Sequence, residues 1–597
     1  MSEQAIYGDT AYYGVELINR SGNGALPVGE HDFAEAMDQC VLVDKTMFIA
    51  DILDADASVV ACCRPEGFGK SMNLSMLRAF LERPTVGQID RGLFAGSQIW
   101  DAGGGRYQDE FACHPVISLD FSGAARCGAN VVGVVHDALS GECTRLLALL
   151  EAPDLPRDKM RHIERVARGV AGEDEVASVL GVLIELLEMA CDEQVVLLVD
   201  GYDAAWLGSA GARDAFGADP AELFDRVLFD AIAAAGDSLR LACLMGERPG
   251  PAVAALSSRG CSNCMSTPLS TWCDRWFGFS DDEVQALLGH AGRGEYLDDA
   301  REWFEGYRFG GFYCSSPARV IDFLNRGCTP PVRADLYGYA DSLSRTVGDW
   351  NLERLSTLFD LLEPHGCVEA PLCLGAVVSN DACVDDVWTA LYLSGFLTTD
   401  MVEEPGSSAC SRARLPNGEL RQALRLAIIE WFESAAEDAR DVDAFRDGLC
   451  RGDEDTVRQA LRRILGDAGV GAAETDSPLP YHLLLQGFCF GMPGYANPSS
   501  NRKRGADRWD IQVFPTGRML DVADTLGMLD ERPLVTMNMM YDPDVDVLGL
   551  ELLAVQALLD IERDGIDEIR VPRPGIGRVR WGFGFDGQHV SVVCQRL

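Results

Sequence analysis

Residues 64–71 read Arg-Pro-Glu-Gly-Phe-Gly-Lys-Ser, a set of residue types that can bind a triphosphate. Such a site needs free backbone N–H groups at a helix N-terminus, a lysine for the β- and γ-phosphates and a hydroxyl for Mg²⁺. Gly69, Lys70 and Ser71 supply these groups in that order. The common pattern has glycine at position 64, where this chain has Arg64, so an ordinary Gly-Lys-Ser helix start fits the same letters. The apolar run before the loop and the amphipathic segment after it favour ATP binding.

A second half-site follows the apolar run 194–199, where Asp200 ends a buried strand. A carboxylate at the end of a neighbouring parallel strand holds Mg²⁺ in P-loop ATPases. An aspartate that simply begins a turn is the alternative. Arg248 follows another apolar run, 239–245, at a position from which it could contact the γ-phosphate, although a surface arginine is nearly as common there. Together these residues predict an ATP and Mg²⁺ site.

The elements that must position these residues alternate between strand and helix. Apolar runs at 58–63, 116–121, 194–200 and 239–245 are separated by segments with helical spacing, which predicts a doubly wound α/β domain of the P-loop NTPase type over 26–275. Residues 1–25 are expected to be a lead-in, residues 276–435 a mainly helical lid or winged-helix-like region, and residues 436–597 a helical linker followed by a β-rich domain. Segments 402–414 and 469–480 are rich in Gly, Ser, Pro and acids and are predicted to be linkers.

Composition limits the class of protein. The chain has 597 residues with 51 Lys+Arg and 93 Asp+Glu, and 51 − 93 gives a net charge of −42. Such a chain repels anionic lipid and binds nucleic acid poorly unless a local basic patch exists, so nucleic acid is possible as a partner but disfavoured. We expect a cytoplasmic protein with no membrane contact, because we find no signal peptide and no apolar run of about 18 residues. The 20 scattered cysteines are typical of reduced, buried thiols.

The ordered set of motifs resembles the bacterial AAA-ATPase-like proteins that carry a C-terminal PD-(D/E)XK nuclease domain. The resemblance runs over most of the chain. Its motifs are Leu26-Pro-Val-Gly29, Asp32-Phe33, Val43-Asp-Lys-Thr46, Arg64-Pro65, Phe68-Gly-Lys-Ser71, His114-Pro-Val-Ile117, Leu198-Val-Asp200, Tyr202-Asp203, Gly246, Arg248, Gly306-Tyr-Arg308, Leu415-Pro-Asn417, Tyr481-His482, Arg508-Trp-Asp510 and Trp581-Gly-Phe-Gly-Phe585.

This resemblance implies roles for single residues. It implies an α/β fold with an ATP-binding domain and a C-terminal α/β nuclease-like domain, and it implies ATP and Mg²⁺ as cofactors. The residues it implies for the nucleotide are Arg64, Phe68, Gly69, Lys70, Ser71 and Arg248, with Ser71 and Asp200 for the metal. Those implied for catalysis are Asp200, Asp203 and Asp510.

The chain departs from the family pattern at both sites. Relatives carry Glu directly after the strand-end Asp, where this chain has Gly201, and losing a general base typically costs roughly 10²–10⁴-fold in rate. Asp203 is a possible substitute, and Glu66 adds a repulsive carboxylate to the loop. In the nuclease half Met537 and Met539 align with the family's Glu-x-Lys, and thioethers cannot replace those groups for a hard cation.

Three functions remain open from the sequence. The first is an ATP-binding regulatory or interaction protein with degenerate ATPase and nuclease sites and an unknown protein partner. The second is an active ATP-dependent nuclease acting on DNA. The third is a scaffold that binds no nucleotide. A basic stretch at 502–508 could touch phosphate, but a solvated loop is the commoner explanation for such residues.

Overall fold

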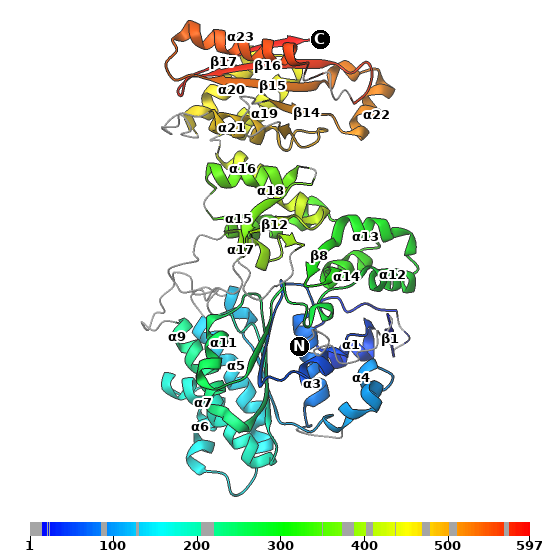
Figure 1. Ribbon diagram of the computed structural model, residues 1–597, viewed down its shortest axis with the longest axis vertical. Coiled ribbons are helices and arrows are strands. Elements are labelled where there is room, and N and C mark those ends of the chain that lie inside the picture. Colours follow the sequence, from blue (N-terminus) through cyan, green and yellow to red (C-terminus); the bar gives the residue numbers. More distant parts are fainter. Residues whose placement is uncertain are drawn as a thin grey trace, which may run out of the picture. The chain divides into compact units, whose positions relative to one another are not determined.

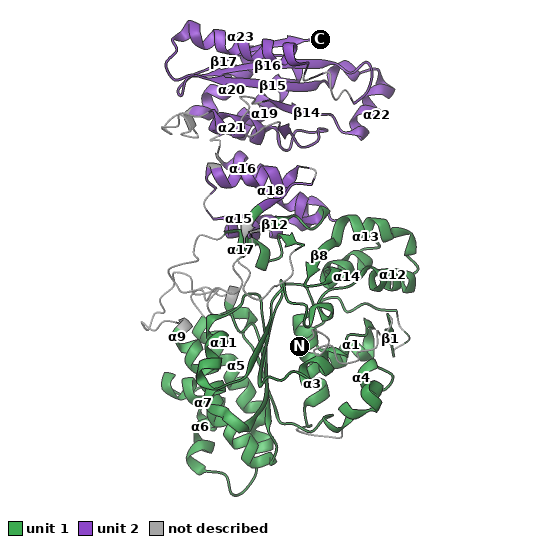
Figure 2. Ribbon diagram, in the orientation of Figure 1, with its two compact units in different colours: residues 1–330, 369–418 green, residues 331–368, 419–597 purple. Residues whose placement is uncertain are grey.

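The structure is a computed structural model that describes most of the chain. The described residues are 15–20, 22, 24–84, 92–126, 131–204, 220–348, 350–363, 365–372, 387–400, 410–435, 438–467, 478–500, 510–565, 567 and 572–597. The chain divides into two compact units, residues 1–330 with 369–418 and residues 331–368 with 419–597 (Figure 2). The middle region expected at 276–435 is therefore shared between the two units.

The first unit is built on a five-stranded parallel sheet with the order β4-β5-β6-β3-β7. Its strands are β3 (Val59–Cys63), β4 (Val116–Asp120), β5 (Val195–Asp200), β6 (Leu239–Gly246) and β7 (Asn263–Ser266). Every residue of β3 and β5 is buried, as expected for apolar strands covered on both faces. Figure 1 shows α3 (Lys70–Leu81) on one face and α5 (Val131–Leu146), α6 (Arg157–Ala167) and α7 (Glu173–Cys191) on the other. The predicted doubly wound α/β domain is confirmed.

Shorter elements complete this part of the first unit. They are β1 (Leu17–Asn19), α1 (Phe33–Gln39), β2 (Val41–Val43), α2 (Phe48–Leu53), α4 (Gln98–Asp101), α9 (Pro220–Asp225), α10 (Ala231–Ala235) and α11 (Pro251–Ala255). The expected lead-in at 1–25 was wrong in one respect, because Leu17–Asn19 pairs with β2 as an antiparallel strand. Among the described helices, none is both long and apolar enough to cross a membrane.

The middle region is mainly helical, as predicted, but it also contains small sheets. Its helices are α12 (Asp281–His290), α13 (Leu297–Phe304), α14 (Pro317–Asn325), α15 (Arg333–Val347), α16 (Leu352–Leu362), α17 (Val387–Leu393) and α18 (Gly418–Ala435). Its strands are β8 (Glu305–Phe309), β9 (Phe312–Ser315), β10 (Val368–Pro371), β11 (Thr398–Thr399) and β12 (Cys410–Arg414). The predicted linker 402–414 was therefore wrong at its end, where β12 pairs with β11.

The second unit ends in a mixed sheet with the order β13-β14-β15-β16-β17. Only β15 and β16 are parallel, and α23 is the crossover helix between them. The elements are α19 (Ala439–Arg451), α20 (Glu454–Asp467), α21 (Leu479–Cys489), β13 (Ser499–Ser500), β14 (Ile511–Val513), α22 (Gly517–Leu526), β15 (Leu534–Tyr541), α23 (Val547–Asp564), β16 (Arg578–Phe585) and β17 (Val590–Arg596). Figure 1 shows α23 on one face of this sheet and α19 to α21 on the other. Leu479 and Pro480, predicted to be linker, begin α21.

Two glycines of β16 explain how α23 lies so close to the sheet. A Cβ added at Gly582 would lie 2.0 Å from the carbonyl oxygen of Ala554, and one at Gly584 would lie 2.5 Å from that of Leu550. Any side chain here would push the helix away from the strand. Glycines inside a strand weaken its signal in the sequence, so β16 is harder to recognise there than the continuous apolar strands.

Candidate functional site

The predicted phosphate loop connects β3 to α3 and has the backbone that such a loop requires. Gly67 and Gly69 have φ angles of +85° and +83°, in the left-handed region that side chains disfavour. Gly69 is the N-cap of α3, so the first N–H groups of this 12-residue helix begin at Lys70. The loop is held from outside by the residues before α14, because the Ser316 hydroxyl donates to the Gly67 carbonyl (3.1 Å). The fixed loop and the helix N-terminus form an anion-binding arrangement.

The topology brings the two predicted half-sites together. β6 lies between β3 and β5, so the chain segments that leave these three strands share one edge of the sheet. Across that edge the Ser71 hydroxyl donates to Asp200 Oδ2 at 2.5 Å. Lys70 Nζ donates to the carbonyl oxygens of Arg64 and Pro65, both at 2.8 Å, so the ammonium lies within the loop that would hold the phosphates.

The charge around Asp200 suits a cation. Burial raises the pKa of the Asp200 carboxyl, while its hydrogen bond from Ser71 and the nearby Lys70 act in the opposite direction. Asp120 ends β4 directly beside Asp200 in the strand register and raises that pKa further. Because charged forms are favoured by an opposite charge nearby, a cation bound here would restore the ionised carboxylate.

The residues around Asp200 suit Mg²⁺, which is held partly by water and phosphate, better than a metal ion held by protein ligands alone. Among the described residues, no group of three or more His, Cys, Asp or Glu side chains could hold a metal ion. Mg²⁺ usually keeps several waters and binds through one or two carboxylates together with substrate phosphates. Ser71 and Asp200 would hold such an ion, and Asp120 is a carboxylate that sequence reasoning missed. The sequence marks Asp120 in the same way as Asp200, because each is an acid at the end of an apolar strand.

The residue after Asp200 has no room for a side chain. Gly201 has a φ of +69°, and an added Cβ would lie 2.6 Å from the backbone nitrogen of Ser122 and 2.7 Å from its Cα. The turn that follows β4 therefore occupies the space at this position. A glutamate at position 201 would therefore not fit this backbone unless the turn after β4 shifted.

The Asp203 carboxylate forms hydrogen bonds within the fold and does not face an open position. Its Oδ2 accepts hydrogen bonds from the backbone N–H groups of Glu247 (2.9 Å) and Arg248 (2.7 Å). The carboxyl is buried, and burial raises its pKa. Tyr202 supports the same turn, since its hydroxyl donates to the Arg248 carbonyl at 2.6 Å. Asp203 therefore fixes the chain where it leaves β6.

That turn carries a carboxylate that the sequence analysis did not select. Glu247 follows β6, one residue after Gly246, whose register partner is Cys63 at the end of β3. Burial raises the pKa of Glu247, Lys70 lowers it, and Asp203 and Glu66 raise it further. These electrostatic neighbours put Glu247 at the same edge as the loop lysine. Arg248 is half-buried at this turn, and its Nε is buried without a hydrogen-bond acceptor among the described residues.

Arg64 lies within the fold and not along the open side of the loop. Its Nη1 donates to the carbonyl oxygens of Cys63 (2.7 Å) and Ser266 (3.0 Å), and Nη2 donates to Ser266 Oγ (3.0 Å). The fully buried guanidinium also lies over the ring of Phe277, 4.8 Å from its centroid. What Arg64 offers the loop is its carbonyl, which accepts from Lys70. This explains why arginine can occupy the position where the common pattern has glycine.

The Phe68 side chain, like that of Arg64, packs inside the fold. Its buried ring contacts Tyr307 and Phe309 of β8 edge to face, each with a centroid distance of 4.9 Å. The ring therefore anchors the loop to the β8–β9 hairpin. A role for the Phe68 side chain in contacting nucleotide, implied by the resemblance, has no support from these contacts.

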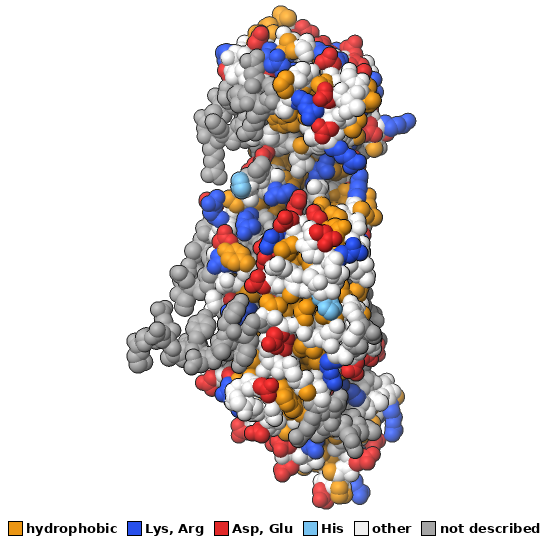
Figure 3. All heavy atoms as spheres, turned by 90° about the vertical axis from the view of Figure 1, so that its right-hand side faces the viewer, with side chains coloured by type: hydrophobic (Ala, Val, Ile, Leu, Met, Phe, Trp, Pro, Cys, Tyr) orange, Lys and Arg blue, Asp and Glu red, His pale blue; other side chains and the backbone are white. Residues whose placement is uncertain are grey.

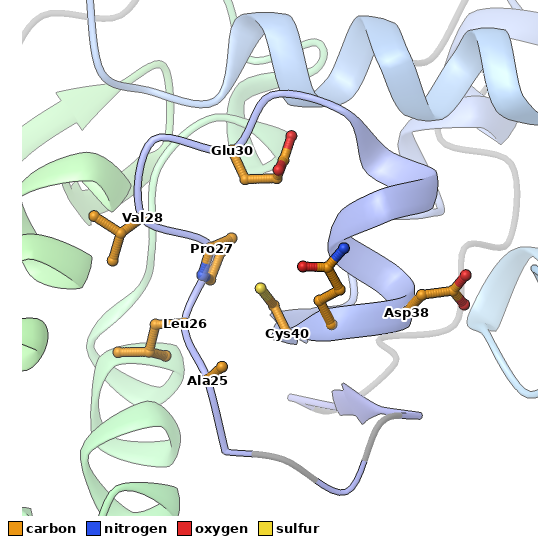
Figure 4. Close-up of a pocket in the computed structure, with 8 residues that line it drawn as sticks. Ala25, Leu26, Pro27, Val28, Glu30, Asp38 and Cys40 are labelled. Atoms are coloured by element: carbon orange, nitrogen blue, oxygen red, sulfur yellow. The ribbon is translucent and has the colours of Figure 1, made fainter.

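A separate hollow of about 430 Å³ is lined by the N-terminal segment of the first unit (Figure 4). Its lining residues are Ala25, Leu26, Pro27, Val28, Glu30, Asp38, Gln39 and Cys40. None of them belongs to the phosphate loop, and Glu30 and Asp38 would repel a phosphate. The hollow is therefore not part of the candidate nucleotide site.

The C-terminal candidate site contrasts with the first. Asp510 is buried and immediately precedes β14, where Ile511 and not Asp510 is the register partner of Met537. Met537 and Met539 pair with Trp581 and Phe583 on the neighbouring strand, so both thioethers lie on a buried apolar face. The basic stretch at 502–508 lies outside the described residues.

A polar chain lies beside this apolar face. His482 of α21 is fully buried, and its Nε2 is 2.7 Å from the Ser500 hydroxyl. The backbone N–H of Ser500 in turn donates to Glu363 at 3.3 Å. No three potential metal ligands gather here among the described residues. Glu363 is a carboxylate that the sequence could not have assigned, because it lies more than a hundred residues before its partner.

Comparison with known proteins covers the region that contains the first site. Residues 27–249 match the family described as a predicted AAA-ATPase. That match covers β3, α3, β5 and β6, the elements that carry Lys70, Ser71, Asp200 and Arg248. A protein of Azotobacter chroococcum mcd 1, described as "Uncharacterized protein in vnfD 5'region", is 25% identical over 411 residues, which covers 68% of this chain and 70% of that protein.

Proposed function

We propose that this protein binds Mg-ATP through Gly69, Lys70, Ser71 and Asp200. The observation that carries the proposal is the 2.5 Å hydrogen bond between the Ser71 hydroxyl and Asp200 Oδ2. It joins the start of the loop helix to the end of β5, as Mg²⁺ coordination in a P-loop site requires. Bound Mg²⁺ would neutralise phosphate charge, while Lys70 and the N–H groups at the start of α3 would hold the phosphate oxygens.

Bound ATP is expected to turn over slowly. Gly201 supplies no base, the carboxylate of Asp203 accepts two backbone N–H groups, and a general base is typically worth roughly 10²–10⁴-fold in rate. Slow turnover suits a protein whose nucleotide-bound state persists long enough to be recognised. The function best supported is therefore a nucleotide-dependent regulatory or interaction protein.

The second unit is proposed to bind a partner without cutting DNA. Its buried methionines replace the groups that would hold a metal, and Met packs well in apolar interfaces and cores. On the face drawn in Figure 3, acidic and basic side chains are interspersed over much of the surface. Ion pairs such as Arg573 with Asp521 (2.7 Å) satisfy basic groups of the second unit. Nucleic acid approaching this face would meet carboxylates as well as arginines.

Calorimetric titration of Mg-ATP into wild type and Lys70→Ala tests nucleotide binding. Loss of the charged donor should weaken binding by about 10- to 100-fold, since a hydrogen bond to a charged group contributes about 1.5–3 kcal/mol. Lys159→Ala is the matched control, because Lys159 forms an exposed ion pair with Glu185 in the same unit. Equal affinity in wild type and Lys70→Ala, or no binding by either, would favour the scaffold hypothesis.

An assay on single- and double-stranded DNA with Mg²⁺ and with Mn²⁺ tests the second unit. We expect no cleavage by the wild type. Metal-dependent cleavage that disappears in Asp510→Ala would establish the active nuclease in its place. Cleavage that persists in Asp510→Ala would come from a contaminating enzyme.

A further inference from the structure

Glu247 is a half-buried acidic residue whose carboxylate does not hold the fold together. Among the described residues, this side chain forms no hydrogen bond and no ion pair. Asp203 differs in this respect, because its carboxylate accepts the backbone N–H groups of Glu247 and Arg248. Burying a charged group without a partner costs free energy, and such groups are typical of functional sites. The Glu247 carboxylate is therefore a candidate for a role in binding.

The backbone places Glu247 beside the phosphate loop. Glu247 directly follows β6, which pairs with β3 before the loop on one side and with β5, ending at Asp200, on the other. The hydrogen bonds to Asp203 fix the turn from which the side chain begins. Burial raises the pKa of the Glu247 carboxyl, and among its charged neighbours Lys70 has the largest effect and lowers that pKa. Glu247 therefore lies within electrostatic range of the loop lysine.

The Lys70 ammonium is oriented by carbonyl oxygens and not by a carboxylate. Its Nζ donates to the carbonyl oxygens of Arg64 and Pro65, and among the residues that the structure describes it forms no ion pair. An ammonium has three N–H donors, so one remains for a ligand. In a phosphate loop this lysine contacts the β- and γ-phosphates. Glu247 is thus close enough to repel a phosphate bound at Lys70 without taking the place of that phosphate.

We propose that Glu247 sets the preference of this site between nucleoside triphosphates and nucleoside diphosphates. The inference rests on the binding of Mg-ATP proposed above. The γ-phosphate brings to Lys70 a negative charge that a diphosphate lacks. Repulsion between like charges falls with distance, so a nucleotide without the γ-phosphate is repelled less by the carboxylate. A repulsive group directed against one of two competing ligands is a common source of specificity.

The loop itself adds to this negative field. Glu66 is exposed and acts on the Glu247 carboxyl in the same direction as burial does. Because an exposed charge is screened by water and salt, Glu247 should have the larger effect of the two. The repulsion reduces the advantage that the γ-phosphate gives to ATP. ADP can then compete with ATP, and the nucleotide bound to the protein follows the ratio of the two in solution.

Calorimetric titration of the full chain with Mg-ATP and with Mg-ADP tests the proposal. Glu247→Gln removes the charge and keeps the shape, so affinity should rise about tenfold for Mg-ATP and no more than about threefold for Mg-ADP. Glu247→Asp keeps the charge and should leave the ratio of the two affinities within about twofold of wild type. Glu185→Gln is the control, because it removes an exposed carboxylate of the same unit that pairs with Lys159, and it should change neither affinity.

Each other result has a definite meaning. An equal gain for both nucleotides in Glu247→Gln, or no gain for either, would overturn the proposal and leave Mg-ATP binding intact. Loss of ATP hydrolysis with unchanged affinities would also overturn it, since Glu247 would then be a general base. A lower Tm for Glu247→Gln than for wild type would show that the carboxylate supports the fold and would likewise overturn it. A wild type that binds neither nucleotide would overturn nucleotide binding itself.

Discussion

The two candidate sites each differ from the pattern that the sequence resembles, and the surroundings of the differing positions are not alike. At the edge of the parallel sheet, the loop lysine, the Ser71–Asp200 hydrogen bond and the carboxylates Asp120 and Glu247 remain together. At the C-terminal sheet, Met537 and Met539 lie in a buried apolar layer with Trp581 and Phe583. Polar groups lie together at the first of these positions, whereas the two methionines of the second are part of the core.

The difference follows from topology. In the parallel sheet, polar residues follow the strands at one edge, so replacing one of them by glycine leaves the apolar strands and the remaining polar groups unchanged. In the mixed sheet, the replaced positions are on β15 itself, between neighbouring strands. Apolar side chains there gain packing with the layer beneath.

The largest expected effect is at the second site. Met537→Glu/Met539→Lys introduces the residue types of the pattern that the sequence resembles but places two charges where the native side chains are 0% and 2% exposed. The free energy of unfolding, measured by chemical denaturation, should fall by about 4 kcal/mol or more. Met528→Glu, at a 39% exposed methionine, should change it by no more than about 0.5 kcal/mol. A stable double variant that cuts DNA would remove the contrast between the sites.

The next effect concerns the glycine at the first site. Gly201→Ala should lower the free energy of unfolding by about 3 kcal/mol, because a Cβ there meets the Ser122 backbone. Gly169→Ala separates backbone strain from this clash, because Gly169 has a similar φ of +67° with nothing within 4 Å, and should cost about 1 kcal/mol. Gly201→Glu should not accelerate ATP hydrolysis. If Gly201→Ala and Gly169→Ala lowered the free energy of unfolding equally, the turn after β4 would have to move enough to make room for the Cβ.

A smaller effect is expected at Asp200. Asp200→Asn should weaken Mg-ATP binding by about tenfold, since the amide cannot supply the negative charge that a divalent cation attracts. Binding of ATP in the presence of a chelator should change little, which separates the metal contribution from that of the loop. Asp120→Asn is the neighbouring comparison and should have the weaker effect, because the hydrogen bond to Ser71 belongs to Asp200. If Asp120→Asn weakened Mg-ATP binding more than Asp200→Asn, Asp120 would be the metal ligand.

The smallest effect is a dependence of stability on pH at Asp203. Burial raises the pKa of this carboxyl in the folded chain, so at pH values between the two pKa values the folded state binds more protons than the unfolded state. Its contribution to stability is therefore present below the ordinary pKa and is lost as pH rises through the folded pKa. Asp203→Asn should flatten this part of the unfolding free energy against pH. Unchanged slopes in wild type and Asp203→Asn would show that Asp203 contributes nothing.

The sequence predicted the elements of the first site well because the apolar strands are continuous runs. Val59–Cys63 and Val195–Asp200 are buried along their whole length, so their hydrophobicity alone marks them. It predicted β16 poorly, because Gly582 and Gly584 weaken the strand signal and their purpose lies in the contact with α23. It also missed β12, which lies between β10 and β11, two strands formed elsewhere in the chain.

What the sequence by itself determined is the set of groups that could act: a lysine and a serine after one apolar strand, an aspartate after another, and methionines where the pattern that the sequence resembles has an acid and an amine. Tertiary structure decided which of these groups are available. It turned the Arg64 guanidinium toward Ser266, bound Asp203 to the turn after β6, and closed the space beside Gly201 with the turn after β4. Each outcome depends on contacts between residues far apart in the chain, and such contacts form only when the sheet brings separate strand ends together.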